Sequence, residues 1–226
     1  MASVPVSRRE RHRVETRDEA KRLALAQLAE SGWSGPCALS LTAIARQMGI
    51  TGPALYRYFA GRDELLAELA GDACEDLADA VHAAARQPGP PRVRVRAVAT
   101  AYRDWALSQP HRYRLLFGAG TSPDLGTEPA ARRTVAALLA ALTGSAPPGG
   151  RIADRPPGGS HFALERLGAT AWTRWHGVLS LQIDGHLGAL GTDPGLAFQI
   201  EVDSVADDAE RLAAAAGPGP NRPSTG

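Results

Sequence analysis

The chain has 226 residues and a mass of 23.7 kDa, enough for one large domain or two small ones with a substantial hydrophobic core. Hydrophobic residues make up 44% and charged residues 22%, which excludes disorder of the whole chain. The longest apolar run, 135–142, falls far short of the ~20 residues of a membrane helix. The first 22 residues lack the apolar core of a secretory signal, and two cysteines cannot form a disulfide framework. We therefore expect no membrane partner and a cytoplasmic location.

The charge is distributed unevenly along the chain. Residues 1–62 contain ten Arg and Lys against five Asp and Glu, a net charge of +5, whereas residues 63–226 contain fifteen against nineteen, a net charge of −4. The total of +1 hides this difference. A basic N-terminal part on an acidic body indicates a nucleic-acid partner.

The N-terminal region begins with a charged segment, 1–13, that has no hydrophobic periodicity. We expect it to be a flexible basic arm, which either reaches into a DNA minor groove or stays solvated. Thr16 then precedes three charged residues, as a helix N-cap does, and apolar residues recur at helical spacing from Ala20 to Leu28. This pattern predicts a first helix from Thr16 to Gly32.

Two short helices with good caps are predicted next, within 40–59. Ser40 precedes a helix that ends at Gly49, and Thr51 precedes a second helix with Pro53 in its first turn. Two short capped helices around a glycine turn are typical of a helix-turn-helix. In that motif the first helix crosses the DNA backbone and the second enters the major groove.

The remaining pattern is also helical. Residues 92–96 alternate as in a strand, but no partner strand is present elsewhere and a lone strand is unstable, so we assign them to a helix. The Gly/Pro-rich segment 143–160 and the tail from 217 are expected to be disordered. The predicted helices cover 62–86, 92–109, 111–118, 128–142, 162–186 and 194–212. The chain is therefore predicted to be all-α.

The segment 49–66, GITGPALYRYFAGRDELL, resembles the motif of the TetR/AcrR family of transcriptional regulators, and the similarity extends over 16–76. A second segment, WTRWHGVLSLQIDGHLG at 172–188, is similar to the Trp-His-Gly (WHG) class of C-terminal domains in that family. The resemblance implies about nine helices, with a three-helix DNA-binding head over 14–76. It further implies a helical-bundle domain over 77–216 that binds a ligand and a second subunit.

The family motif, carried onto this sequence, assigns DNA contacts to small, hydroxyl-bearing and basic residues of the head. They are Ser40, Thr42, Thr51, Gly52, Pro53, Ala54, Tyr56, Arg57, Tyr58 and Arg62. The resemblance implies that Tyr56, Tyr58 and Arg62 hold phosphates and that Arg57 lies at the groove. The alternative is that the two tyrosines are core aromatics, although Leu55 and Phe59 already supply an inward face. Pro53 replaces a residue that is often polar in the family, which leaves less base reading at that position.

Aromatic residues of the helical body are candidates for an effector site. Apolar, aromatic-lined cavities with few polar groups are typical of small-molecule sites. The alternative for each residue is ordinary packing in a helix bundle, and the family resemblance is what favours a pocket. The candidate ligand-binding residues are Trp105, His111, Phe117, Trp172, Trp175 and His176.

The last two predicted helices suggest an interface between two copies of the chain. Glycine in a helix interior costs ~1 kcal/mol, a cost that close helix–helix approach would offset, unless the sequence merely tolerates it. Two antiparallel helices from each subunit would form a four-helix interface with two-fold symmetry. The candidate interface residues are Gly168, Gly177, Gly185, Phe198, Val202, Val205, Ala209 and Leu212.

These observations together predict a ligand-responsive regulator that binds double-stranded DNA. By resemblance it is a homodimeric repressor, with a palindromic operator, released by a small and largely apolar effector. No HExxH motif, Cys/His ligand pair, phosphate loop or nucleophile elbow occurs, so we expect no enzyme activity, catalytic residue, metal or other cofactor. The alternatives are a helical small-molecule-binding protein without a primary DNA role and an enzyme of unrecognised type.

Overall fold

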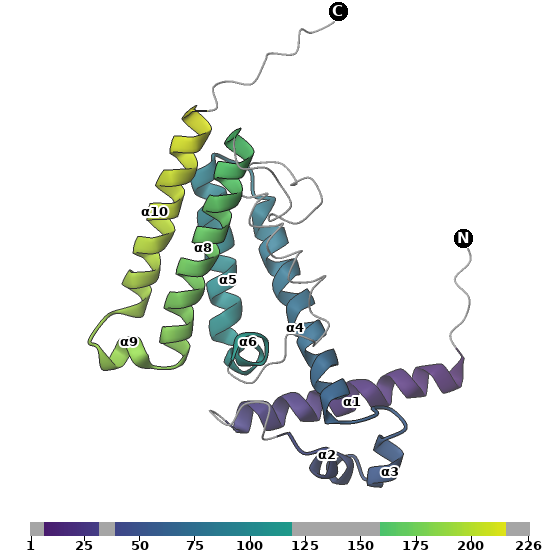
Figure 1. Cartoon of the computed structure of the whole chain (residues 1–226). Coiled ribbons are helices and arrows are strands. Elements are labelled where there is room, and N and C mark those ends of the chain that lie inside the picture. The colour runs from purple at the N-terminus through teal and green to yellow at the C-terminus, as the bar shows by residue number, and fades with distance from the viewer. Residues whose placement is uncertain (1–6, 32–38, 119–158, 216–226) are drawn as a thin grey trace, which may run out of the picture. The chain divides into compact units, whose positions relative to one another are not determined.

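The computed structural model describes residues 7–31, 39–118 and 159–215, and all regular structure within these ranges is helical (Figure 1). None of the described helices is long and apolar enough to cross a membrane. The all-α class is thus confirmed for the part of the chain that the structure describes. The helices are α1 (Arg8–Glu30), α2 (Leu41–Gln47), α3 (Gly52–Leu55), α4 (Arg62–Ala85), α5 (Pro91–Ser108), α6 (Pro110–Phe117), α8 (Gly159–Ile183), α9 (His186–Ala189) and α10 (Pro194–Ala215).

These helices form two compact units, and α4 runs through both. The first unit contains the described residues up to Cys74 together with α6, and the second contains α4 from Glu75, α5 and α8–α10. The division falls at 74–75, close to the expected head boundary at 76. Helix α6, which the sequence pattern placed in the C-terminal domain, belongs to the first unit because Leu115 is buried in its core.

The first unit has a hydrophobic core to which every helix in it contributes. Ala24 of α1, Ile44 of α2, Leu55 of α3, Leu69 of α4 and Leu115 of α6 are all buried in it. Leu23, Leu25, Met48, Ile50, Tyr58 and Leu116 pack on this core while remaining partly exposed.

The short helices begin where the sequence predicts. The Ser40 hydroxyl accepts a hydrogen bond from the Ala43 amide, and the Thr51 hydroxyl accepts one from the Ala54 amide, each at 3.3 Å. Gly49, with φ of +69°, makes the turn between them, a conformation that glycine adopts without steric cost. The predicted caps and the glycine turn are therefore confirmed.

The flexible arm predicted over 1–13 is wrong for residues 8–13, which are helical, and residues 1–6 lie outside the described residues. Helix α1 begins at Arg8, and the Ser7 hydroxyl caps it by accepting a hydrogen bond from the Glu10 amide. Thr16 is not a cap; its hydroxyl donates to the His12 carbonyl in mid-helix. The first two turns bury no side chain, so hydrophobic periodicity could not reveal them, whereas the Ser-x-x-Glu spacing of a capping box was present at residues 7–10.

The second unit is built around α5, α8 and α10, which lie side by side in Figure 1. The stripe predicted as a subunit interface faces inward instead: Phe198, Val202, Val205 and Ala209 of α10 are buried within the chain, and Leu212 is half-buried. A stripe of helical period indicates that one face is buried, but it does not say against what. The prediction that a second subunit covers the four buried side chains is therefore wrong, whereas for Leu212 it stays a prediction.

Helix α8 begins and ends earlier than predicted. It starts at Gly159, inside the loop expected over 143–160, and ends at Ile183, after which Gly185 has a left-handed φ of +77°. Gly185 therefore makes a turn, and Gly168 is buried within the subunit. Only Gly177 of the three candidate glycines faces open space within α8. The rest of the predicted loop, the predicted helix at 128–142 and the tail lie outside the described residues.

Candidate functional site

The segment after Thr51 presents one polar face and one buried face. Leu55 and Phe59 are each 1% exposed and point into the core, as the spacing predicted. Tyr56 is 56% exposed and Arg57 is exposed beside it, whereas Tyr58 is half-buried and packs on the core. The two tyrosines thus differ: Tyr56 is free to meet a ligand, and Tyr58 is partly a core aromatic.

This segment is less helical than predicted. Helix α3 covers only four residues, and the chain then continues in a turn. In that turn the Arg57 amide donates to the Ala54 carbonyl at 3.3 Å and the Tyr58 amide to the Leu55 carbonyl at 2.9 Å. The small residues Gly52 and Ala54 leave the start of the segment slim, which suits close approach to a DNA groove.

Arg17 of α1 holds the end of this segment, a role that sequence reasoning missed. Its guanidinium donates to the Tyr58 carbonyl and lies 4.4 Å from the Phe59 ring centroid. It also pairs with Glu68 and, at 3.6 Å, with Glu64 of α4. One side chain therefore ties α1, the turn after α3 and α4 together. No local signal identifies it, because the partners lie 41–51 residues away in the chain.

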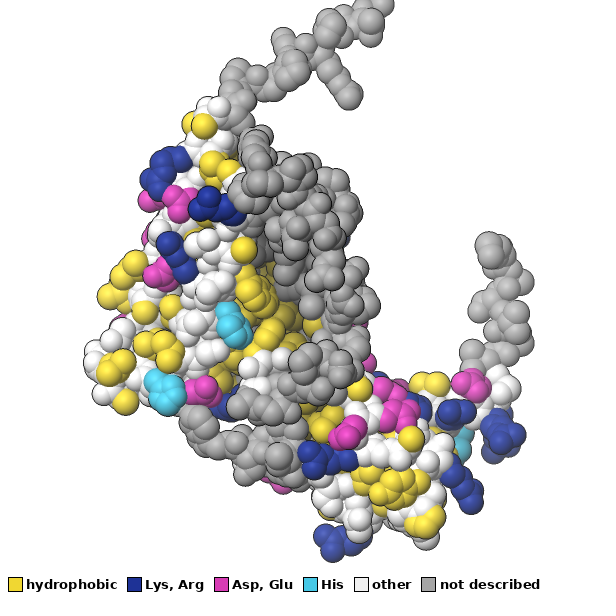
Figure 2. Space-filling view, in the orientation of Figure 1, with side chains coloured by type: hydrophobic (Ala, Val, Ile, Leu, Met, Phe, Trp, Pro, Cys, Tyr) yellow, Lys and Arg dark blue, Asp and Glu magenta, His cyan; other side chains and the backbone are white. Residues whose placement is uncertain are grey.

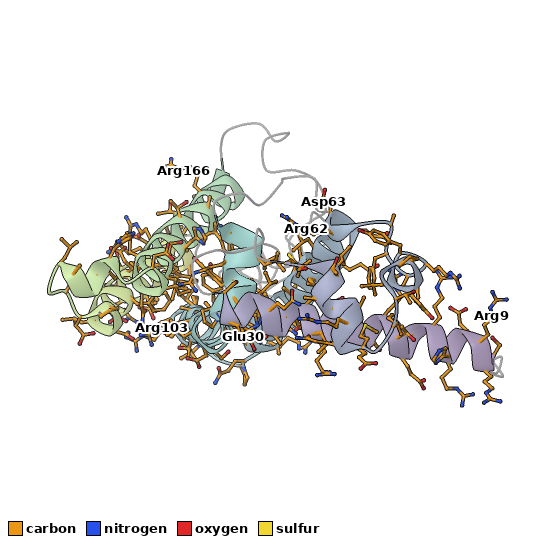
Figure 3. The ribbon with its side chains drawn as sticks, turned by 90° about the horizontal axis from the view of Figure 1, so that it is seen from below. Arg9, Glu30, Arg62, Asp63, Arg103 and Arg166 are labelled. Carbon is orange, nitrogen blue, oxygen red and sulfur yellow. The ribbon has the colours of Figure 1, made fainter. Side chains whose placement is uncertain are left out.

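Arg62 and Asp63 open α4 (Figure 3). Arg62 is half-buried, and within the described ranges its buried Nε atom has no hydrogen-bond partner. The neighbouring Glu64 carboxylate accepts a hydrogen bond from the Ala60 amide. A cation at a helix N-terminus is opposed by the helix dipole, which favours an anion there. A phosphate would satisfy both the arginine and the helix end.

Other cations surround this surface. Arg46 on α2 is exposed, as are Arg8, Arg9, Arg11 and Arg13 on the first turns of α1. Figure 2 shows Lys and Arg side chains around the first unit, at the lower right. Ser40, Thr42, Thr51 and Pro53 are also exposed, although the hydroxyls of Ser40 and Thr51 already cap helices. This surface can hold a polyanion by many dispersed contacts.

In the second unit, two of the candidate effector residues form a cluster with Tyr102. The His176 ring stacks on Trp172 with centroids 5.9 Å apart and an interplanar angle of 9°. The Tyr102 ring lies 5.0 Å from Trp172, and its hydroxyl is 3.1 Å from His176 Nδ1. Burial lowers the pKa of His176 below its ordinary value near 6.5, because it disfavours the charged imidazolium. Tyr102 is buried in this cluster, whereas Trp172 and His176 are half-buried.

The other four candidates lie elsewhere. Trp105 and Trp175 are buried, and their indole N–H groups have no hydrogen-bond partner among the described residues. The Trp175 ring lies next to Phe198, with centroids 6.4 Å apart. His111 and Phe117 belong to the first unit, where burial, and then the charge of Arg112, lower the pKa of His111. The six predicted residues are therefore not one cluster within either unit.

The comparisons with known proteins agree with this geometry. Residues 22–69 match the family of bacterial regulatory proteins of the tetR family, and residues 95–205 match the tetracyclin repressor-like C-terminal domain. The chain is 34% identical over 218 residues to the HTH-type transcriptional regulator Rv1816 of Mycobacterium tuberculosis, covering 84% of this chain and 93% of that protein. This chain belongs to the TetR family. As a TetR-family transcriptional regulator it has a DNA-binding and a ligand-binding domain, and its relatives are regulators rather than enzymes.

Solved structures share the fold of this TetR-family chain. Regulatory protein SCO4313 superposes with a TM-score of 0.71 at 38% identity, covering 88% of this chain and 98% of that one. A TetR-family transcriptional regulator from Streptomyces coelicolor superposes with a TM-score of 0.60 at 22% identity, covering 89% and 82%. The second likeness concerns the fold alone.

The C-terminal unit of this TetR-family chain carries four large exposed apolar side chains on and next to α8 and α10, which we call the α8–α10 face. It consists of Leu181 on α8, Leu190 after α9, and Leu196 and Ile200 on α10. Leu190, Leu196 and Ile200 are 75%, 61% and 58% exposed, and hydrophobic side chains are visible over α9 and α10 at the left of Figure 2. Gly177, four residues before Leu181, leaves open space beside it. Ion pairs that join α10 to α5 and α8 hold this surface in shape.

Proposed function

We propose that this TetR-family regulator is a homodimeric repressor that acts in the cytoplasm, where its palindromic operator lies, and leaves the operator on binding a small, largely apolar effector. The observation that carries the DNA part is the segment from Thr51 to Phe59. Its buried residues anchor it to the core, its first residues are small, and Tyr56 and Arg57 after them remain exposed.

Within this proposal, contacts to phosphate and contacts to bases fall to different residues. Tyr56, Tyr58 and Arg62 hold phosphate, which carries no sequence information directly. Arg57 is the side chain of the segment best suited to a bidentate contact with guanine, worth ~1–3 kcal/mol of discrimination. Thr42, Pro53 and the two caps approach the backbone closely enough to position the segment.

A randomised half-site library, bound by each variant, tests this division. Arg62→Ala should weaken specific and random DNA alike and reduce the slope of log affinity against log salt by about one per subunit. Tyr58→Phe should weaken binding without changing the preferred sequence, because a hydroxyl alone is lost. Arg57→Ala should relax the preference at one base pair of each half-site.

The control is Arg46→Ala, which removes an exposed cation on α2 instead. It should leave the base preference unchanged. An unchanged base preference in Arg57→Ala as well would move Arg57 to the phosphate set. Selection of no preferred sequence by the wild-type protein would overturn the operator proposal itself.

The homodimer is proposed on the α8–α10 face. An exposed apolar surface of this kind marks an association site, and two copies of the same two-helix surface pack with two-fold symmetry. The proposed interface keeps Gly177 and the two helices that the sequence predicted. It uses the exposed side of α10 instead of the stripe that is buried within the chain. Two heads in such a dimer would bind half-sites whose centres lie about one helical turn, or a multiple of it, apart.

The effector is proposed to bind beside the Tyr102–Trp172–His176 cluster. The half-buried Trp172 ring favours an apolar body, and the half-buried His176 imidazole beside it suits a polar group of the effector. The effector must bind the DNA-incompetent state more tightly, or it shifts nothing. Helix α4 connects the units and would transmit the change. Titration with apolar compounds tests this: failure to quench tryptophan fluorescence and to weaken operator binding would refute it.

A further inference from the structure

A groove between α5 and α10, in the second unit, is not used by the proposed function. It encloses about 340 Å³, at the small end of ligand sites. Arg96, Thr100 and Arg103 line it from α5, and Gly195 and Gln199 line it from α10. The Tyr102–Trp172–His176 residues are not among those that line it.

The two arginines of the groove differ in their partners. Arg96 is paired: its Nε and Nη2 atoms lie 3.1 and 2.7 Å from Asp203 Oδ1, and the Gln199 amide also donates to that carboxylate. Arg103 has no ion pair with any residue that the structure describes, and its Nε atom is buried without an acceptor. Its guanidinium carbon lies 5.6 Å from the Phe198 ring centroid. Arg103, labelled in Figure 3, is therefore a cation whose donors are incompletely satisfied.

Gly195 keeps space open beside this cation. A Cβ atom at that position would lie 3.7 Å from Arg103 Nη2 and 3.2 Å from Asp193 Oδ1. The Asp193 carboxylate already accepts hydrogen bonds from the Gly195 and Leu196 amides at 2.7 and 3.2 Å. Because the start of α10 is satisfied in this way, an incoming anion would meet the guanidinium rather than free backbone amides.

We propose that this groove is a second ligand site, which binds the carboxylate of a small organic acid on Arg103. A guanidinium matches a carboxylate in a planar, two-bond geometry. Thr100 and Gln199 supply polar groups for the rest of the molecule. Asp104 also lines the groove and Asp203 lies next to it, so one negative charge on the ligand is favoured over two. The site takes a monocarboxylate in preference to phosphate or a dicarboxylate.

The test uses the full-length chain and sodium benzoate, with benzamide as the neutral isostere and inorganic phosphate as the dianion, at constant ionic strength. Binding is followed by saturation-transfer NMR on the probe and by the arginine Nε signals of the protein. Benzoate should bind with a millimolar Kd and shift the Arg103 signal, while benzamide and phosphate bind at least about tenfold more weakly.

Three variants locate the site. Arg103→Gln should weaken benzoate at least about tenfold, and Gly195→Val should do the same by filling the groove without changing the charge. Arg211→Gln, which removes an exposed arginine farther along α10, should leave the affinity unchanged. Circular dichroism shows that each variant is folded, and if Arg103→Gln is not, Arg103→Lys takes its place.

The proposal is overturned by any of three results: no saturable benzoate binding up to about 20 mM, a concentration that reveals millimolar Kd values; equal binding of benzamide; or unchanged affinity in Arg103→Gln and Gly195→Val. None of these depends on DNA, so the site can fail while the repressor proposal stands.

Discussion

Replacing Arg17 by methionine should loosen the segment from Thr51 to Phe59, for which we propose DNA binding, although Arg17 itself is not among the proposed DNA contacts. The substitution keeps an unbranched side chain but removes the guanidinium that donates to the Tyr58 carbonyl, covers the Phe59 ring and pairs with Glu68. A hydrogen bond from a charged donor contributes ~1.5–3 kcal/mol and a guanidinium on a ring ~0.5–1 kcal/mol. The ion pairs are partly exposed and add little. We expect a loss of about 2–4 kcal/mol in the free energy of unfolding of the first unit.

Lys21→Met is the matched control. Lys21 also lies on α1, has the same 21% side-chain exposure, and pairs with α4 through Asp72 at 2.8 Å, but no contact joins it to the segment after α3. Its loss should cost about 1 kcal/mol or less. Urea unfolding followed by circular dichroism measures both variants, and hydrogen exchange at the Tyr58 and Phe59 amides reports the local loosening.

Operator binding separates positioning from phosphate contact. Arg17→Met should weaken operator binding by about tenfold or more, because the loosened segment must be ordered again on DNA, yet leave the salt dependence unchanged. Arg62→Ala should reduce the salt dependence. If Arg17→Met and Lys21→Met lost equal stability, or if Arg17→Met reduced the salt slope, Arg17 would be an ordinary surface cation and the reasoning would be refuted.

Three further predictions concern a cap, a histidine and the subunit surface. Thr51→Ala should cost ~1 kcal/mol of stability in urea unfolding because Ala54 loses its cap, whereas Thr42→Ala, which removes an exposed hydroxyl, should cost less; equal losses would contradict the capping role. Because burial lowers the pKa of His176, the free energy of unfolding should be highest above about pH 6.5 and should fall as the pH drops below that value. His176→Gln should reduce this fall, and a variant with the same pH profile as the wild type would contradict the role of His176. Ile200→Arg should yield folded monomers in sedimentation, because Ile200 is 58% exposed on the proposed face. Val205→Arg should unfold the bundle, because Val205 is fully buried. A dimeric Ile200→Arg variant would refute the proposed face.

The features of this chain that depend on neighbours in sequence were readable without coordinates. Ser40 and Thr51 cap helices through amides three residues ahead, and Gly49 turns the chain by its own backbone freedom. The inward spacing of Leu55 and Phe59 follows from helical geometry in the same way. Hence the all-α class and the helix-turn-helix could be predicted, and the family with them.

The start of α1 could also be read from neighbouring residues, but the signal there is a capping box and not hydrophobic periodicity. A helix that buries nothing over its first turns gives no apolar stripe, so the pattern suggested a flexible arm. Ser7 and Glu10 were the residues that could have corrected this.

Contacts between segments far apart in the sequence decided which surface each helix face and each charged side chain meets. The stripe on α10 required a buried face, and only the positions of α5 and α8 showed that it lies inside the subunit while Leu196 and Ile200 face outward. Likewise, the partners of Arg17, and the lack of an acceptor for Arg103 Nε among the described residues, depend on segments tens of positions away. Spacing along a helix tells which side chains share a face, but the identity of the surface opposite that face arises from the tertiary fold, because it depends on where other segments come to lie.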